Sequence, residues 1–540
     1  MRAFSRLGSK PARFAVRLVV LILVFLITTG FTSSTLDQIG QLIEIYYYGD
    51  IPPGVWEAQT PHGMVDALGD PYSEYFTAEE FNEFYNGINM EFEGIGAYVE
   101  SVPEGILLTS IFDGSGASDA GLLQGDIIVK ADGLILSGLS LEEGISHIKG
   151  PDGTWVDLVI LRDGQEFEVS VQRKKIHIPA VTGTIEDGTG YIRIYSFSEN
   201  ISSEFHDLLK QMEEENAKGY IIDVRGNPGG FLDSVVELLG YFIGSKTSLI
   251  SRDKHGNTFY YNALAEEAPI DKPIVVLVDE YSASASEIFA AAIKDYESAV
   301  IMGSTTYGKG TVQNLFLLPE GDAVKLTVQH FYSPLDNEIN EKGVEPHIDT
   351  GDADPLPAAK LLMAGQPEAF RLSGFLKLAA GGKAFYIDLN SARTDENWEA
   401  LNAILEALEA NGGSLSHGGG LGWRGFKASD WADKPRVLFP DYKILADLKD
   451  VPAEKEFTIT FNRSIDPSTI TASTVELIDG ESGERAELSI SQLTGSRVKV
   501  VPKKPLKPGG TYYLAINPGI TDIKGHVMGK GTVVEVTIRR

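Results

Sequence analysis

The chain has 540 residues, a length greater than one hydrophobic core usually organises, which predicts several domains. Its hydrophobic fraction of 43% is typical of a globular protein. Its 46 basic and 76 acidic residues give a net charge of −30, which argues against a nucleic-acid partner because like charges repel. There is no cysteine, which excludes thiol nucleophiles, thiolate metal sites and disulfides, and the nine histidines show no metal-ligand spacing, so we expect no metal and no cofactor.

The N-terminus predicts export. A cluster of basic residues precedes an apolar run from Leu18 to Ile27, and no acidic residue occurs before Asp37. Residues 1–35 therefore form a signal peptide or a membrane anchor, and the absence of a clear A-x-A cleavage site favours a retained anchor. The basic residues are Arg2, Arg6, Lys10, Arg13 and Arg17.

The next two segments differ in their periodicity. Residues 36–85 mix helical spacing of apolar residues with a turn-rich aromatic stretch, which predicts a small helical region. Residues 86–173 alternate strand-type segments with glycine turns and contain one helical segment at 140–148, which predicts a β-rich domain. The strand-type segments are 96–99, 106–111, 126–130, 156–162 and 166–172.

The remaining chain predicts three further regions. Residues 174–352 alternate strand and helix, as expected of an α/β layered core. Residues 353–435 predict a helical and linker region, with a helix at 396–410 and a glycine linker at 418–420. Residues 436–540 carry alternating Val-, Thr- and Tyr-rich runs that predict a β-sandwich. The expected fold class is thus multidomain α+β.

A candidate nucleophile, Ser284, lies at the centre of S-A-S-A-S-E at 282–287, which follows the apolar strand-type run at 274–278 and opens an Ala-rich helix. At such a junction, backbone N–H groups and the positive end of the helix can stabilise an oxyanion. The alternative is a capping box formed by Ser284 and Glu287, which occurs in many helices that have no catalytic role.

A candidate general base, Lys309, lies in G-K-G-T-V-Q at 308–313. Residues 303–309 also spell G-x-x-x-x-G-K, which is most of a phosphate-binding loop. Gly310 replaces the Ser or Thr that would hold magnesium, and strand-like residues follow instead of a helix, which argues against nucleotide binding. An exposed lysine in a glycine turn is the other alternative.

A third segment, D-V-R-G-N-P-G-G at 223–230, leads from a strand into a turn where paired glycines let backbone amides face a ligand. Together the three segments resemble the C-terminal processing peptidases, or tail-specific proteases, over residues 60–350. In that family the middle serine of S-A-S-A-S-E is the nucleophile, and the lysine of G-K-G-x-V-Q, twenty-five residues further on, is the base. The resemblance implies a serine endopeptidase with a dyad of Ser284 and Lys309.

The same resemblance implies supporting residues. Gln313 falls where the family has a supporting glutamine, and the oxyanion-hole amides are implied at Gly229 or Gly230 and at Ala285. A lysine can accept a proton from serine only when it is neutral, and its free pKa is about 10.4. The site must therefore partly desolvate the amine for Lys309 to act as the base.

Residues 86–173 resemble a PDZ domain. F-E-G-I-G-A at 92–97 falls where that domain has its carboxylate-binding loop, and A-S-D-A-G-L-L-Q-G-D at 117–126 fits its signature, although a glycine-rich hairpin is the alternative. The resemblance implies that protein substrates with accessible, apolar C-terminal tails are captured by backbone N–H groups and added to a sheet edge. The implied tail-binding residues are Gly94, Ile95, Gly96 and Ala97.

From about residue 436 the chain resembles the bacterial Ig-like domains of surface-layer proteins, through F-T-I-T-F-N-R-S-I-D-P-S-T-I at 457–470. That resemblance implies a module that docks to a cell-wall or envelope partner. With the N-terminal segment, it implies a location on the outer side of the bacterial cytoplasmic membrane, either anchored by a single pass or secreted.

The sequence departs from the peptidase family after Leu326. Q-H-F-Y at 329–332 and L-D-N-E at 335–338 replace a basic strand and a Ser-Gly-Arg turn, so the resemblance does not extend to substrate preference near the cleft. His330 has no paired partner in the sequence and is expected to be a strand residue. The alternative function, an inactive PDZ and Ig-like scaffold, would be expected to have lost Ser284, Lys309 or Gln313, and all three are present.

Overall fold

The computed structural model describes residues 34–265, 268–365, 367, 372–380, 382–410, 414–420, 422–427, 430 and 433–540. The described residues divide into two compact units, one within residues 34–85, 252–257 and 311–330 and one within residues 86–251, 258–310 and 331–540. The membrane segment predicted at 1–35 lies outside the described residues except for its last two positions. None of the described helices has both the length and the apolar character that crossing a bilayer requires.

The smaller unit joins the helices before residue 86 to a later β-hairpin. Helix α1 begins after a capping box of Ser34 and Asp37, and its apolar side chains share one buried cluster with side chains of the hairpin. The hairpin strands pair antiparallel, and a short early strand adds to their edge. The elements are α1 (Thr35–Tyr46), the 3-10 helix η1 (Pro53–Glu57), α2 (Pro61–Asp66), β1 (Glu74–Phe76), α3 (Ala78–Ile88), β17 (Thr311–Leu317), the 3-10 helix η2 (Pro319–Gly321) and β18 (Ala323–Tyr332).

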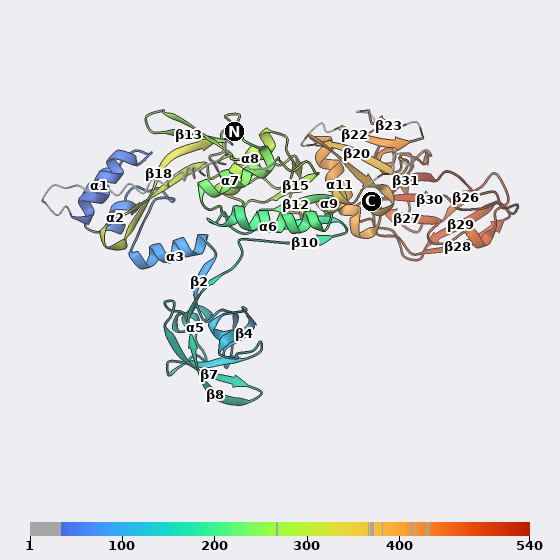
Figure 1. The fold of residues 1–540 in the computed structure, drawn as a ribbon. Coiled ribbons are helices and arrows are strands. Elements are labelled where there is room, and N and C mark those ends of the chain that lie inside the picture. Colours follow the sequence, from blue (N-terminus) through green and yellow to red (C-terminus); the bar gives the residue numbers. More distant parts are fainter. Residues whose placement is uncertain are drawn as a thin grey trace, which may run out of the picture. The chain divides into compact units, whose positions relative to one another are not determined.

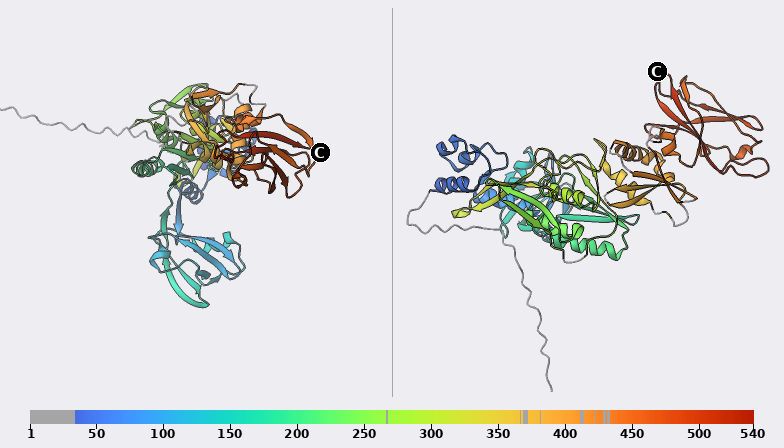
Figure 2. Two further views of the ribbon diagram at one scale, coloured as in Figure 1. Left: turned by 90° about the vertical axis from the view of Figure 1, so that its right-hand side faces the viewer. Right: turned by 90° about the horizontal axis from the view of Figure 1, so that it is seen from above.

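Residues 86–178 of the larger unit form a β-rich group, visible in Figure 2, around one buried cluster. The sheet has the order β3-β4-β5-β7-β8 with β6 paired to β5, and β2 and β9 form a separate antiparallel ribbon. The five predicted strands correspond to β3, β4, β5, β7 and β8 and the predicted helix to α5, whereas β2, β6, β9 and α4 were not predicted. The elements are β2 (Glu91–Gly94), β3 (Ala97–Val102), β4 (Gly105–Ile111), α4 (Gly116–Asp119), β5 (Ile127–Ala131), β6 (Leu134–Ile135), α5 (Leu141–Ile148), β7 (Trp155–Arg162), β8 (Gln165–Gln172) and β9 (Lys174–His177).

Residues 181–303 and 348–349 supply a sheet of order β10-β11-β12-β15-β16-β19, which is parallel from β11 onward. Strands β13 and β14 of this stretch do not belong to that sheet. Strands β12, β15 and β16 are buried at every position, as expected of parallel strands that are covered on both faces. Figure 1 shows α6, α7 and α8 beside this sheet. The elements are β10 (Val181–Glu186), β11 (Thr189–Ile194), α6 (Ile201–Glu214), β12 (Gly219–Asp223), α7 (Leu232–Ile243), β13 (Thr247–Asp253), β14 (Thr258–Asn262), β15 (Ile274–Val278), α8 (Ala285–Asp295), β16 (Val300–Gly303) and β19 (Ile348–Asp349).

The region predicted as helices and linker at 353–435 contains an antiparallel sheet of order β21-β20-β22-β23. The linker predicted at Gly418–Gly420 is wrong for Gly418 and Gly419, which belong to β22. A Cβ on Gly418 would lie 1.9 Å from the Leu372 carbonyl oxygen, so this glycine allows a close backbone approach. The elements are α9 (Pro355–Ala364), β20 (Phe375–Ala380), β21 (Lys383–Asp388), α10 (Leu389–Ala392), α11 (Asp395–Ala410), β22 (Ser414–Gly419), β23 (Gly422–Gly425) and α13 (Lys434–Leu438).

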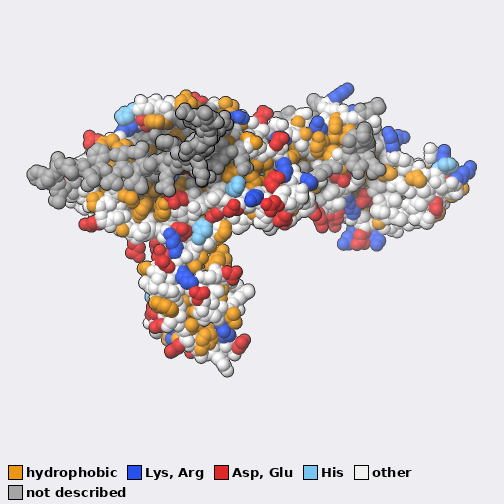
Figure 3. All heavy atoms as spheres, viewed as in Figure 1, with side chains coloured by type: hydrophobic (Ala, Val, Ile, Leu, Met, Phe, Trp, Pro, Cys, Tyr) orange, Lys and Arg blue, Asp and Glu red, His pale blue; other side chains and the backbone are white. Residues whose placement is uncertain are grey.

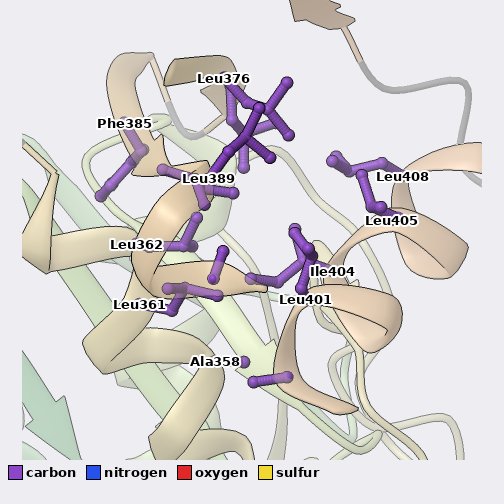
Figure 4. Close-up of a cluster of buried hydrophobic side chains, with 14 of the residues drawn as sticks. Ala358, Leu361, Leu362, Leu376, Phe385, Leu389, Leu401, Ile404, Leu405 and Leu408 are labelled. Atoms are coloured by element: carbon purple, nitrogen blue, oxygen red, sulfur yellow. The ribbon is translucent and has the colours of Figure 1, made fainter. Parts of the chain in front are cut away.

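Helices α9 and α11 supply much of a large buried cluster. In Figure 4, Leu361 and Leu362 of α9 lie opposite Leu401 and Ile404 of α11. The same cluster includes one alternating set of residues from β15 and β16 and also Tyr513 of the C-terminal region. Trp398 of α11 is fully buried and donates its indole N–H to the Gly480 carbonyl at 3.1 Å. The described residues of 353–435 are therefore packed structure and not a spacer.

The C-terminal residues form the two sheets that the alternating runs predicted, β24-β31-β30-β27 with β25 on β31, and β26-β29-β28, around one buried cluster. On the face shown in Figure 3, acidic and basic side chains are interspersed on the surface. The elements are β24 (Lys443–Ile444), β25 (Leu448–Val451), β26 (Phe457–Thr460), the 3-10 helix η3 (Pro467–Thr469), β27 (Val475–Asp479), β28 (Leu488–Thr494), β29 (Arg497–Pro502), β30 (Thr511–Ile516) and β31 (Thr532–Ile538).

Candidate active site

The three motif segments all begin at the carboxyl ends of strands in the parallel sheet, so they lie at the same end of it. Residues 224–230 follow β12, residues 279–284 follow β15 and residues 304–310 follow β16, and these three strands are neighbours in that order. Parallel strands end at a common edge, which is where α/β sheets usually bind ligands. The topology therefore brings together three segments that lie up to 80 residues apart in the sequence.

Ser284 lies at the junction between the loop after β15 and helix α8. Its φ of 55° and ψ of −111° are unusual for a residue with a side chain, so the surrounding contacts must hold this backbone conformation. The flanking serines are structural, because buried Ser282 donates its hydroxyl to the Val224 carbonyl and buried Ser286 donates to the Asn227 carbonyl, each at 2.9 Å. Of the three serines in the motif, only Ser284 is partly exposed.

A buried carboxylate links the serine segment to the lysine segment. Glu287 Oε2 accepts the backbone N–H of Ser284 at 2.9 Å and that of Lys309 at 2.8 Å, so these two nitrogens are at most about 6 Å apart. Glu287 Oε1 accepts from the Thr306 hydroxyl at 2.7 Å and from Gly308 N–H at 2.6 Å. Burial raises the pKa of the Glu287 carboxyl, and these hydrogen bonds oppose that shift by stabilising the carboxylate.

The Pro-Gly-Gly turn lies directly against Ser284. A Cβ on Gly229 would be 2.9 Å from the Ser284 Cβ, and Asn227 anchors the turn by accepting Gly229 N–H at 2.9 Å. That bond occupies the Gly229 amide. Across the described residues, neither Gly230 N–H nor Ala285 N–H donates a hydrogen bond. Of the two glycines predicted for an oxyanion hole, Gly230 therefore has the available amide.

The two glycines beside Lys309 are each required by the backbone, but for different structural reasons. Gly308 has a φ of 92°, which favours glycine, and its carbonyl accepts Glu341 N–H at 2.8 Å. A Cβ on Gly310 would lie 2.3 Å from the Asn340 nitrogen, so only glycine fits there without movement. The Lys309 side chain is half-buried. The lysine is thus carried by a tightly packed loop, and the alternative of a lysine in a loose exposed turn is wrong.

A concave surface lies in residues 92–178. It is a groove of about 210 Å³ between β3, helix α5 and the ribbon of β2 and β9. The carbonyls of Ile95 and Gly96 accept N–H groups from Ala117 and Phe112, whereas the Ile95 and Gly96 N–H groups have no hydrogen-bond partner within the described residues. Strand β3 is an edge strand of its sheet. The groove thus combines available amides, a free strand edge and an apolar lining.

Comparisons with known proteins show the family to which this chain belongs. Residues 188–350 match peptidase family S41, and residues 442–537 match a bacterial Ig-like domain. A probable CtpA-like serine protease of Staphylococcus aureus (strain MRSA252) is 33% identical over 356 residues, which cover 64% of this chain and 70% of that protein. The chain belongs to peptidase family S41. It is a serine-type peptidase related to the C-terminal processing proteases, and it acts on protein substrates.

This S41 peptidase is also similar to the carboxy-terminal processing protease CtpA of Bacillus subtilis (strain 168), and one solved structure aligns with it in part. The Bacillus protein is 36% identical over 288 residues, which cover 53% of this chain and 62% of that protein. The structure of the photosystem II D1 C-terminal processing protease aligns with 22% identity over 61% of this chain and 97% of that chain, with a TM-score of 0.38.

Gln313 of this S41 peptidase lies in β17, in the smaller compact unit. Its amide Nε2 donates to the hydroxyls of Thr311 at 2.9 Å and Thr327 at 3.2 Å, which fixes the orientation of the side chain. His330 lies in β18 and stacks on Tyr48, with ring centroids 4.2 Å apart, as a strand residue would. The role of Gln313 beside the lysine stays a prediction.

Sequence reasoning missed a buried ion network at the end of β12. Asp223 is fully buried and accepts hydrogen bonds from Arg193 at 2.8 Å and from Arg225 at 2.7 Å. Burial alone would raise the pKa of Asp223, but the hydrogen bonds from Arg225 and Tyr191 hold it below its usual value. The network fixes the start of the Pro-Gly-Gly segment. The only sequence signal for it was the position of Asp223 and Arg225 directly before that turn.

Sequence reasoning also interpreted Glu287 too narrowly. The capping contact to Ser284 is present, but the same carboxylate binds three donors in the lysine segment. Its capping and its bridging of the two segments are therefore compatible. The described residues contain no group of three or more His, Asp or Glu side chains that could hold a metal ion.

Proposed function

We propose that this chain is an exported C-terminal processing endopeptidase in which Ser284 is the nucleophile and Lys309 the general base. The observation that carries the proposal is the bridge made by Glu287, whose one oxygen accepts the backbone N–H groups of both residues. A carboxylate in that position brings the serine and the lysine into the same small volume, although they are twenty-five residues apart in the sequence.

The proposed reaction follows from these placements. Neutral Lys309 Nζ takes the proton of Ser284 Oγ while that oxygen attacks the peptide carbonyl carbon. The negative charge that develops on the carbonyl oxygen is stabilised by the N–H groups of Gly230 and Ala285, with the N-terminus of α8 adding its positive end. Lys309 then gives the proton to the leaving amine, and water hydrolyses the acyl-enzyme by the reverse sequence. Gln313 is proposed to hold the lysine by a hydrogen bond.

We further propose that residues 86–173 act as a PDZ domain that receives substrate tails. The tail would add to the free edge of β3, and its terminal carboxylate would accept the N–H groups of Ile95 and Gly96, with Gly94 and Ala97 completing the loop. The groove lining favours apolar tails, because Ile145 and Ile148 of α5 and Ile176 of β9 all contribute to it.

The location proposed is the bacterial cell envelope, on the outer side of the cytoplasmic membrane. The basic and apolar pattern of residues 1–35 supports export, with membrane attachment through that segment, and the match of residues 442–537 to a bacterial Ig-like domain supports docking to an envelope partner. The inactive scaffold is not favoured, because the strained serine, the buried carboxylate and the packed lysine loop are all retained.

A serine-reactive probe tests the dyad. The intact chain is treated with a biotinylated fluorophosphonate and the modified residue is identified by mass spectrometry. We expect a single label on Ser284 and a strongly slowed reaction in Lys309→Ala, because the serine then lacks its base. A label on another serine, or labelling of Lys309→Ala at the rate of the unmodified protein, would contradict the proposal.

A further inference from the structure

Two large aromatic side chains are exposed at the carboxyl edge of the parallel sheet. Tyr281 follows β15 and is 65% exposed, and Tyr307 follows β16 and is 58% exposed. Tyr281 precedes the proposed nucleophile by three residues, and Tyr307 precedes the proposed base by two. Most of the neighbouring side chains in both segments are buried or half-buried, so these two rings stand out from a packed surface.

The backbones that carry the two rings are fixed to each other and to the rest of the edge. Tyr307 donates its N–H to the Ser282 carbonyl at 3.1 Å, so the loops after β15 and β16 are joined next to both tyrosines. Tyr281 donates its N–H to Asp279 Oδ1 at 3.1 Å, and the same oxygen accepts Gly226 N–H at 2.9 Å. The rings therefore project from a rigid frame, which reduces the entropy lost when they bind a ligand.

Exposed tyrosines of this kind fit contact with substrate. Each ring offers a large apolar face at a low cost in side-chain entropy, and aromatic residues are enriched where proteins bind other chains. No fold-stabilising role explains them, since more than half of each side chain lies in water. A peptide bound for attack by Ser284 must pass across this edge, because the nucleophile and the available amides lie there.

We propose that Tyr281 and Tyr307 form an aromatic rim that binds apolar side chains of the substrate next to the scissile bond. This inference rests on the proposed function of Ser284 and Lys309 and adds a substrate preference to it. The rim binds through the ring faces and not through the hydroxyl groups, so phenylalanine at either position preserves it. The tyrosines are specificity residues and take no part in proton transfer.

The test compares kinetics on an unfolded protein. Fluorescein-labelled β-casein is digested by the full chain, by the double variant Tyr281→Ala/Tyr307→Ala and by the corresponding double Phe variant. We expect the Ala variant to raise KM about tenfold with kcat changed less than about twofold, and the Phe variant to match the original. Tyr260→Ala is the matched control, because Tyr260 of β14 is also 65% exposed but does not belong to the motif loops.

The cleavage sites give a second readout that a structural role would not move. Mass spectrometry of the casein fragments should show large apolar residues beside the cut bonds for the original chain and a weaker bias for the Ala variant, with equal melting temperatures. An unchanged KM together with an unchanged site distribution would overturn the rim. If Ser284→Ala still cleaves casein, the proposed function itself fails. If Ser284→Ala is inactive but the double Ala variant keeps the original KM and cleavage sites, only the aromatic rim is removed.

Discussion

The two surfaces proposed to meet substrate are built in opposite ways. At the sheet edge, polar contacts fix the backbone: the Glu287 carboxylate accepts four hydrogen bonds, and Asn227 and Ser286 bind the turn that faces Ser284. The groove of residues 92–178 is bounded mainly by isoleucine and aromatic side chains.

This difference predicts how each surface responds to mutation. A hydrogen-bonded frame has few acceptable arrangements, so one lost group displaces reacting atoms and the rate falls steeply. An apolar groove loses binding energy in proportion to the area removed, so single changes give graded effects. Steep loss of rate at the edge and graded loss of affinity in the groove are therefore the expected pattern.

The largest effect is expected at the nucleophile. Ser284→Ala should lower the rate of casein cleavage by about a thousandfold or more, because no other group can form the acyl-enzyme. The circular dichroism spectrum and the melting temperature should stay close to those of the original chain, since the side chain is only part-buried. Residual cleavage within about tenfold of the original would contradict the proposed edge chemistry.

The next largest effect is expected from mutation of Glu287, which tests the hydrogen bonds that join the serine and lysine loops. Glu287→Gln replaces a carboxylate that accepts four donors with an amide whose NH2 group faces two of them, so we expect kcat to fall about a hundredfold. The free energy of unfolding should fall by about 2–4 kcal/mol. The control is Glu297→Gln, since Glu297 is exposed just beyond the end of α8. Equal effects of the two variants on kcat would remove the special role of Glu287.

The groove should give a smaller, graded effect. In the Ser284→Ala background, a fluorescein-labelled decapeptide ending in Leu-Val should bind about tenfold more weakly after Ile145→Ser, measured by fluorescence anisotropy. Amidation of its C-terminus should also weaken binding about tenfold, because the Ile95 and Gly96 amides lose a charged acceptor. Ile135→Ser, at an exposed position on β6, is the matched control. Tight binding of the amidated peptide would contradict tail capture.

The smallest effect is expected at His347, where a buried side-chain hydrogen bond fixes the backbone of the neighbouring strand β16 in the parallel sheet. Burial, with the Lys294 ammonium nearby, lowers the pKa of His347 to about 4, and neutral His347 Nδ1 accepts Ile301 N–H at 2.9 Å. The unfolded chain takes up this proton near pH 6.5, so stability is present above that pH and is lost as pH falls toward 4.

Between about pH 7.5 and about pH 5.5 this residue should remove about 1 kcal/mol of unfolding free energy. Urea denaturation at both pH values measures the loss, and His347→Gln should make it smaller by that amount. An identical pH dependence in the two proteins would show that His347 does not titrate in this way.

Several features were predictable from sequence because their signals are local. The helix at 396–410 and the strand at 274–278 have a clear period or an unbroken apolar run, and the structure has α11 and β15 there. The sheet of residues 375–425 was not predictable, because β22 and β23 are short strands that each contain two glycines, and β22 pairs with β20, which lies on the far side of α11 in the sequence. A glycine run was therefore mistaken for a linker where Gly418 instead packs against Leu372.

The sequence alone determined the candidate residues: the spacing of S-A-S-A-S-E and G-K-G-x-V-Q pointed to Ser284 and Lys309, and N-P-G-G pointed to the adjacent turn. Tertiary structure decided how these segments meet, which of Gly229 and Gly230 keeps an available amide, and that Glu287 joins the serine and lysine loops. The physical reason is that motifs and periodicity are properties of neighbouring residues. Hydrogen bonds between loops depend on strand order, which no local pattern encodes.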